Sequence, residues 1–141
     1  MRSTLIVLAL LGILASSLAL REHYNTGDSP CDINAKWDCG VVNKSIFAMV
    51  GPIPVAAIGI AGYLLLGLLA FRRAYLPMRI ATTLALAFSL YLAHIEKDLL
   101  QVWCIYCVCS LVIISLMTLL LFAMKMAEMA RRKQISAKQR A

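Results

Sequence analysis

Long apolar runs, each bounded by charged residues, constrain this chain more than any other feature. The first run extends from Thr4 to Leu20 and the second from Val55 to Phe71. Both approach the ~20 apolar residues that a helix needs to cross a bilayer. The chain as a whole is 62% hydrophobic, against roughly 45–50% in soluble domains, and the runs therefore predict a membrane protein.

The third apolar run, residues 79–124, is too long for one helix across a bilayer. The charged triplet Glu96-Lys97-Asp98 interrupts it, and burying three such charges at mid-bilayer would cost roughly 8–10 kcal/mol. We therefore expect a surface turn there, and hence an all-α four-transmembrane-helix bundle in a single domain, 1–141. The expected segments are spans at about 4–20, 55–71, 80–95 and 99–124, an outer loop at 21–54 and a basic tail at 125–141.

The first run has a second interpretation. Small residues lie near its end, and the apolar region of a cleaved signal peptide needs only ~7–15 residues. We expect a retained helix, with the signal peptide as the alternative. The small residues are Ala15, Ser16, Ser17 and Ala19.

The basic residues predict the orientation of the bundle. Ten of the fourteen lysines and arginines fall on one side of the four expected spans, which the positive-inside rule assigns to the cytoplasm. The loop at 21–54 is then extracytoplasmic. Because the cations cluster at the ends of apolar runs, and form no stripe interleaved with aromatic residues, no nucleic-acid partner is expected. The ten residues are Arg2, Arg72, Arg73, Arg79, Lys125, Arg131, Arg132, Lys133, Lys138 and Arg140.

The outer loop carries turn-forming residues at 27–30, followed by Cys31 and Cys39. Apolar residues then recur at helical spacing over 42–50, which predicts a short amphipathic helix on the membrane surface. The segment Gly51-Pro52-Ile53-Pro54 is expected to end that helix.

A second pair of cysteines, Cys104-Ile105-Tyr106-Cys107, follows the charged triplet at the outer end of the last span. Such a pair is compatible with a redox dithiol, half of a metal site, or two buried thiols. A helix N-terminus stabilises a thiolate, which favours the redox interpretation. Cys109 lies about 200° around the helix from Cys107, so we expect it to face lipid or packing partners.

Cys31 and Cys39 enclose a short loop, and the simplest interpretation is a structural disulfide that stabilises the fold by about 2–3 kcal/mol. However, about fifteen residues tether Cys39 to the second span, a reach of at most ~50 Å. Cys39 can therefore reach Cys104, and two dithiols in reach can exchange a disulfide and move two electrons. A membrane quinone is a lipid-soluble acceptor for such electrons.

The four cysteines form part of a longer ordered pattern, which consists of Cys31-Asp32, Cys39 after seven intervening residues, Ser45 six further on, and Cys104-x-x-Cys107. This pattern resembles that of the vitamin K epoxide reductase family, and the resemblance covers roughly residues 5–124. The resemblance implies that Cys31 and Cys39 form the shuttle pair, that Cys39 attacks Cys104, and that Cys107 lies next to the quinone. It also implies a positioning role for Ser45 and a quinone pocket lined by Val55, Ile58 and Leu111.

The expected function is a membrane thiol:quinone oxidoreductase that supports disulfide formation. Its co-substrate would be a quinone of the ubiquinone, menaquinone or phylloquinone type, or a quinone epoxide. Its partner would be a separate extracytoplasmic thioredoxin-like protein, DsbA-like or disulfide-isomerase-like. The expected location is the bacterial inner membrane with the site facing the periplasm, or the endoplasmic reticulum membrane in a eukaryote.

Two alternatives remain at the level of sequence. A non-enzymatic membrane protein would use Cys39, Cys104 and Cys107 as thiolate ligands of a soft metal. A structural membrane subunit would contain one stabilising disulfide, Cys31 to Cys39, and inert helix thiols.

Overall fold

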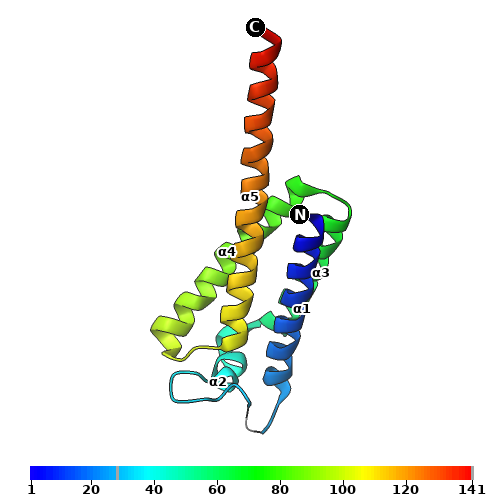
Figure 1. Ribbon diagram of the computed structural model, residues 1–141. Helices are drawn as coiled ribbons and strands as arrows, with labels where there is room; N and C mark the ends of the chain where they lie inside the picture. The colour runs from blue at the N-terminus through cyan, green and yellow to red at the C-terminus, as the bar shows by residue number, and fades with distance from the viewer. Residues whose placement is uncertain (28, 141) are drawn as a thin grey trace.

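The computed structural model describes residues 1–27 and 29–140, and it is helical over most of its length (Figure 1). The expected all-α class is confirmed. Three segments are long and apolar enough to span a membrane: Arg2–Tyr24, Tyr75–Leu100 and Ile105–Arg140. A fourth apolar helix, Val55–Phe71, is shorter at 17 residues. The principal helices are α1 Arg2–Tyr24, α2 Cys39–Lys44, α3 Val55–Phe71, α4 Tyr75–Ile95 and α5 Ile105–Arg140.

Helices α1 and α3 pack closely because small residues line their interface. A side chain added at Gly59 would meet the Ser16 hydroxyl at 2.8 Å, and one at Gly12 would collide with the Tyr63 ring. Such close backbone approach is typical of membrane helices that pack through small residues. A Cβ atom added at Gly62, by contrast, would have no neighbouring atom within 4 Å.

The apolar core lies between α1, α3, α4 and α5, toward the end of the bundle that holds the N-terminus. Helix α5 packs against both α1 and α4, so its buried face joins the two sides of the bundle. The core residues are Leu5, Ala9, Tyr63, Leu66, Ala70, Met78, Ile114, Met117 and Leu121.

The connections between helices lie at opposite ends of the bundle. Figure 1 shows the N-terminus and the α3–α4 turn at one end, and the α1–α2 and α4–α5 connections at the other. In the α3–α4 turn, Arg73 adopts a left-handed conformation with φ 56°. The third span was expected to begin near residue 80, but α4 begins at Tyr75 and includes Pro77 in its first turn. Proline is tolerated there because an N–H in the first helical turn has no intrahelical partner.

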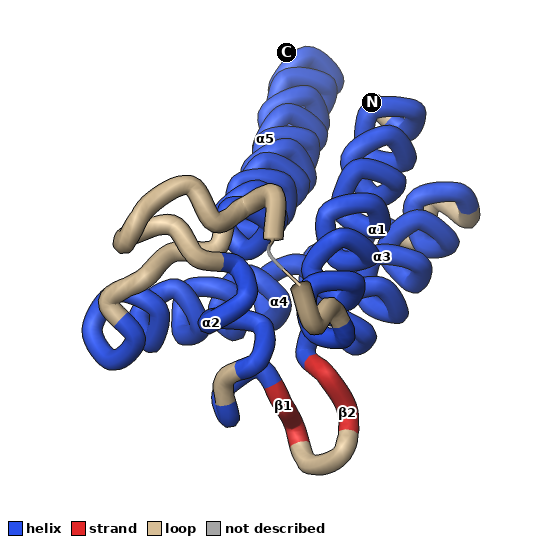
Figure 2. Tube along the Cα trace, turned by 90° about the horizontal axis from the view of Figure 1, so that it is seen from below, coloured by secondary structure: helices blue, strands red, loops and turns tan. Residues whose placement is uncertain are grey.

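The expected amphipathic helix at 42–50 was wrong in its bounds. The Asp38 carboxylate accepts a hydrogen bond from the Val41 amide at 2.8 Å, and this cap starts α2 three residues earlier. Ser45 is extended, and a single turn of 3-10 helix, Ile46–Ala48, follows. Strands β1 Met49–Val50 and β2 Ile53–Pro54 then form a small antiparallel hairpin (Figure 2).

The junction between α4 and α5 also differs from the expected surface turn. The charged triplet lies in a π-helical turn, Glu96–Leu100, which continues α4. Gln101 then reverses the chain in a left-handed conformation, φ 55°, and α5 begins only at Ile105. Lys97 and Asp98 are exposed as expected, but Glu96 is buried. The expected basic tail continues as helix to Arg140 and projects beyond the bundle (Figure 1).

Candidate active site

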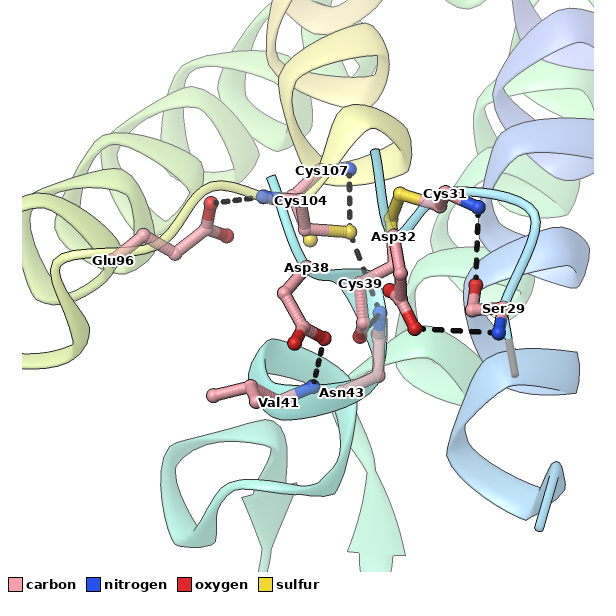
Figure 3. The surroundings of a disulfide bond; sticks show 10 residues. All are labelled: Ser29, Cys31, Asp32, Asp38, Cys39, Val41, Asn43, Glu96, Cys104 and Cys107. Atoms are coloured by element: carbon pink, nitrogen blue, oxygen red, sulfur yellow. Dashed lines mark hydrogen bonds between the residues drawn. A yellow bond between two sulfur atoms is a disulfide. The ribbon is translucent and has the colours of Figure 1, made fainter. Parts of the chain in front are cut away.

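The outer loop is fixed to the segment that precedes α5 by two backbone hydrogen bonds. The Trp103 amide donates to the Lys36 carbonyl at 2.7 Å, and the Asp38 amide donates to the Trp103 carbonyl at 3.1 Å. Because Asp38 and Trp103 each precede a cysteine, this pairing brings Cys39 and Cys104 together. Both cysteines are fully buried and belong to one cluster (Figure 3).

Cys31 and Cys39 form a disulfide, with their Cα atoms 5.6 Å apart. Two hydrogen bonds fix the turn around Cys31. The Cys31 amide donates to the Ser29 hydroxyl, and the Ser29 amide donates to the Asp32 carboxylate, both at 3.2 Å. Cys39 is the first residue of α2. The bond therefore joins a hydrogen-bonded turn to the start of a helix.

Cys104 occupies the position just before the first residue of α5, and its sulfur accepts two hydrogen bonds. The donors are the Cys107 amide at 3.4 Å and the side-chain amide of Asn43 at 3.3 Å. Hydrogen bonding from Cys107, together with that from Asn43, lowers the pKa of the Cys104 thiol, although burial and the Glu96 carboxylate act in the opposite direction. The arrangement favours a nucleophilic thiolate at Cys104.

Asn43 is a site residue that the sequence analysis missed. Its side chain is buried, and it also donates to the Cys39 carbonyl at 2.9 Å, so one amide group contacts both cysteine pairs. Its own backbone carbonyl accepts a hydrogen bond from the His23 ring at the end of α1. A signal was available: Asn43 follows Cys39 by four residues, which places both on one helical face once Asp38 is taken as the cap.

Glu96 is the second missed residue. It is 4% exposed, and its carboxylate accepts a hydrogen bond from the Cys104 amide at 3.1 Å (Figure 3). Its membership of a charged triplet favoured an exposed position. The π-helical turn that rotates it inward has no pattern of its own in the sequence.

We call Cys31 and Cys39 the outer pair, and Cys104 and Cys107 the inner pair. An apolar cavity of about 370 Å³ lies beside Cys107 of the inner pair. Cys107 lines it, as do all four other residues expected near a quinone: Ser45, Val55, Ile58 and Leu111. The Ser45 hydroxyl donates to the Val42 carbonyl at 2.8 Å. The volume is within the ~300–1,000 Å³ of typical small-molecule pockets.

The three remaining cysteines differ in their surroundings. Cys104 and Cys107 are free thiols within the site, whereas Cys109 is free and exposed, in line with its expected outward direction. The alternative metal site requires a Cys39 thiolate, and Cys39 is bonded to Cys31. Across residues 1–27 and 29–140, no three His, Cys, Asp or Glu side chains are grouped as metal ligands.

The site thus combines an oxidised cysteine pair, a reduced pair and an apolar cavity at one end of a helical bundle. Comparison with curated proteins gave no match. Residues 3–123 match the model of the vitamin K epoxide reductase family, which agrees with the resemblance in the cysteine spacing. The chain therefore belongs to the vitamin K epoxide reductase family, a family of membrane-associated oxidoreductases.

Proposed function

We propose that this protein is a membrane thiol:quinone oxidoreductase that supports disulfide formation outside the cytosol. The observation that carries the proposal is the shared burial of Cys39 and Cys104, with Cys107 of the same inner pair lining an apolar cavity. The two pairs lie in series between a loop and a pocket. That order suits a relay of electrons from a protein thiol to a lipid-soluble acceptor.

The relay consists of two thiol–disulfide exchanges, in which each disulfide formed replaces one that is broken, and a final oxidation of the inner pair by the quinone. A reduced thioredoxin-like partner, DsbA-like or disulfide-isomerase-like, attacks the Cys31–Cys39 disulfide and leaves with a disulfide of its own. Cys39 then attacks Cys104 of an oxidised inner pair, and Cys31 resolves the mixed disulfide. Finally, Cys104 and Cys107 form a disulfide as two electrons and two protons pass to the quinone.

The observed pairing corresponds to one stage of this cycle. Cys31 and Cys39 are bonded while Cys104 and Cys107 are free, which is the state after internal exchange and before quinone reduction. The lowered pKa of Cys104 supports this assignment, since the thiolate is the reactive form in disulfide chemistry.

The cavity residues fit an apolar quinone head group. Val55 and Ile58 contribute from the first turn of α3, and Leu111 contributes from α5 one helical turn after Cys107. Ser45 lines the same cavity from the outer loop. A quinone of the ubiquinone, menaquinone or phylloquinone type, or a quinone epoxide, is the co-substrate in this proposal.

The proposed topology has four spans. These are the three segments that are long and apolar enough to cross a membrane, together with the shorter helix α3. Its 17 residues rise about 25 Å, close to the ~30 Å of the hydrocarbon core. Both chain ends and the α3–α4 turn then face the cytoplasm, and the cysteine cluster faces the periplasm of a bacterial inner membrane, or the lumen if the membrane is the endoplasmic reticulum.

The test is quinone reduction by the purified protein in detergent, driven by a reduced thioredoxin-like protein. Single alanine variants of Cys31, Cys39, Cys104 and Cys107 are compared with Cys109→Ala, a matched control outside the cluster. Loss of activity in the four variants with retention in Cys109→Ala is the expected result. Full activity without Cys31 and Cys39 would show that this pair is only a structural disulfide.

A further inference from the structure

We propose that Glu96 is a catalytic residue of the inner cysteine pair, carrying thiol protons from Cys104 and Cys107 to the quinone. The inference rests on the proposed function and adds to it the route of the protons. Glu96 is buried at the junction of α4 and α5, and its carboxylate accepts a hydrogen bond from the Cys104 amide. The same carboxylate lies beside the Cys107 side chain.

The chemistry of the inner pair requires a proton acceptor. Oxidation of two thiols to a disulfide breaks two S–H bonds, forms one S–S bond and releases two electrons and two protons. Reduction of a quinone to its quinol consumes both electrons and both protons. In an apolar cavity a protein group that carries these protons is favoured, because electron transfer without them would leave unpaired charge in a low-dielectric site.

Glu96 lines the cavity together with Cys107, so both the carboxylate and the donor thiol border the space that the acceptor would occupy. Among the described residues, three other ionisable side chains line the cavity: His23 and Tyr63, which are bonded to other groups, and Tyr106, whose phenol is neutral at pH 7 and is a poor proton acceptor. The His23 ring is bonded to the Asn43 carbonyl, and the Tyr63 hydroxyl is bonded to Ser110 at 2.9 Å. The neighbouring charges, Lys97 and Asp98, are exposed, and Asp98 pairs with His94 at 2.8 Å.

The step proceeds in two transfers. Cys104 passes its proton to the Glu96 carboxylate as it becomes the thiolate, and Glu96 gives that proton to one quinone oxygen. The carboxylate, ionised again, accepts the Cys107 proton as the Cys104–Cys107 disulfide forms and the two electrons pass to the quinone, and it carries this proton to the second oxygen. Glu96 ends in its starting state, and no further reactant is needed.

The first experiment is a single turnover, in which the protein with a reduced inner pair is mixed with a soluble short-chain quinone. Glu96→Gln keeps the size of the side chain and an oxygen for the Cys104 amide, but it cannot carry a proton. We expect the rate of quinone reduction to fall at least ~100-fold, as for loss of a general acid–base group. Exchange between the Cys31–Cys39 disulfide and a thioredoxin-like protein should stay within about twofold of wild type.

The matched controls are Asp98→Asn, which neutralises an exposed carboxylate two residues away, and Glu22→Gln, which neutralises the other buried glutamate among the described residues. Both should reduce quinone at the wild-type rate. Wild-type speed in Glu96→Gln would overturn the inference while leaving the relay intact. Failure of the wild type itself to reduce quinone would instead overturn the proposed function.

A second measurement does not depend on turnover rate or on the stability of Glu96→Gln. Time-resolved infrared difference spectra of the wild type, recorded after quinone is mixed with the reduced protein, should show a transient protonated-carboxyl band that shifts in D2O. The band should persist in Glu22→Gln and change frequency in Glu96→Asp. A spectrum without this band, or one that Glu96→Asp leaves unaltered, would contradict proton transfer through Glu96.

Discussion

The chemistry of the site depends on single polar atoms placed among apolar side chains. The Asn43 amide donates to the Cys104 sulfur and to the Cys39 carbonyl, so it stabilises the Cys104 thiolate and orients the two pairs. Burial makes such a donor more valuable, because water is not available to replace it.

Asn43→Ala should therefore raise the pKa of Cys104. A hydrogen bond to a charged group stabilises it by ~1.5–3 kcal/mol, and removing the donor leaves burial and Glu96 to favour the neutral thiol. The thiolate should then appear only at higher pH. Ultraviolet titration of the reduced protein, with Cys104→Ser as the baseline, measures this midpoint.

Ser45→Ala is the control for that titration, because the Ser45 hydroxyl is bonded to the Val42 carbonyl rather than to Cys104. Its titration curve should match that of the wild type. An unchanged curve in Asn43→Ala would show that the Cys107 amide alone sustains the thiolate.

The sequence and the family resemblance singled out the cysteines and the residues that line the cavity, whereas Asn43 and Glu96 were missed. Cysteine spacing carries its own signal, because the type and order of these residues are rare together. Asn43 and Glu96 are common polar residues, and their roles arise from the cap at Asp38 and the π-helical turn at Glu96–Leu100. Neither feature changes the hydrophobic pattern.

At the level of elements, the bundle depends on close contact between α1 and α3. The Tyr63 ring lies directly over Gly12, and α3 can approach α1 only because position 12 has no side chain. Gly62, one residue before Tyr63, has open space around it. The same substitution at the two positions should therefore have opposite effects.

Gly12→Ala should destabilise the protein by about 1–3 kcal/mol, since the ring must move in a packed core. Gly62→Ala should be neutral or stabilising by up to ~1 kcal/mol, because alanine favours helix. Thermal unfolding in detergent measures both. Equal melting temperatures for the two variants would contradict the observed packing of Tyr63.

The helices themselves were predictable to different degrees. Helix α3 has the expected bounds, Val55–Phe71, because Pro54 and Arg72 mark the ends of its apolar run. The fourth span was expected to start at Leu99, but α5 starts at Ile105. The expectation was wrong because the residues that connect α4 to α5 are largely apolar and continue the pattern of the helix. Hydrophobicity locates membrane segments, but it does not distinguish an apolar connection from the helix that follows it.

At the scale of the whole molecule, the connections at the two ends of the bundle should face opposite sides of the membrane. Single cysteines are introduced at Asn34 in the outer loop, Ala74 in the α3–α4 turn and Ala137 near the C-terminus, in a chain without native cysteines. A membrane-impermeant thiol reagent added outside intact cells should label Asn34→Cys alone.

Labelling of Ala74→Cys together with Asn34→Cys would show that α3 does not cross the bilayer and would remove the four-span topology. Labelling of Ala74→Cys and Ala137→Cys in intact cells, without labelling of Asn34→Cys, would reverse the orientation of the site. Reagent added to opened cells should reach every position and thus controls for accessibility.

The central claim is that a disulfide relocates between the outer and inner pairs through Cys39 and Cys104. The most direct measurement uses a chain in which Cys31, Cys107 and Cys109 are replaced by serine, followed by mild oxidation and peptide mapping by mass spectrometry. A Cys39–Cys104 disulfide should form in nearly all molecules, and a matched chain that retains Cys39 and Cys107 in place of Cys39 and Cys104 should form far less. If Cys39 and Cys104 both remain open to alkylation after oxidation, the two pairs do not exchange and the relay is contradicted.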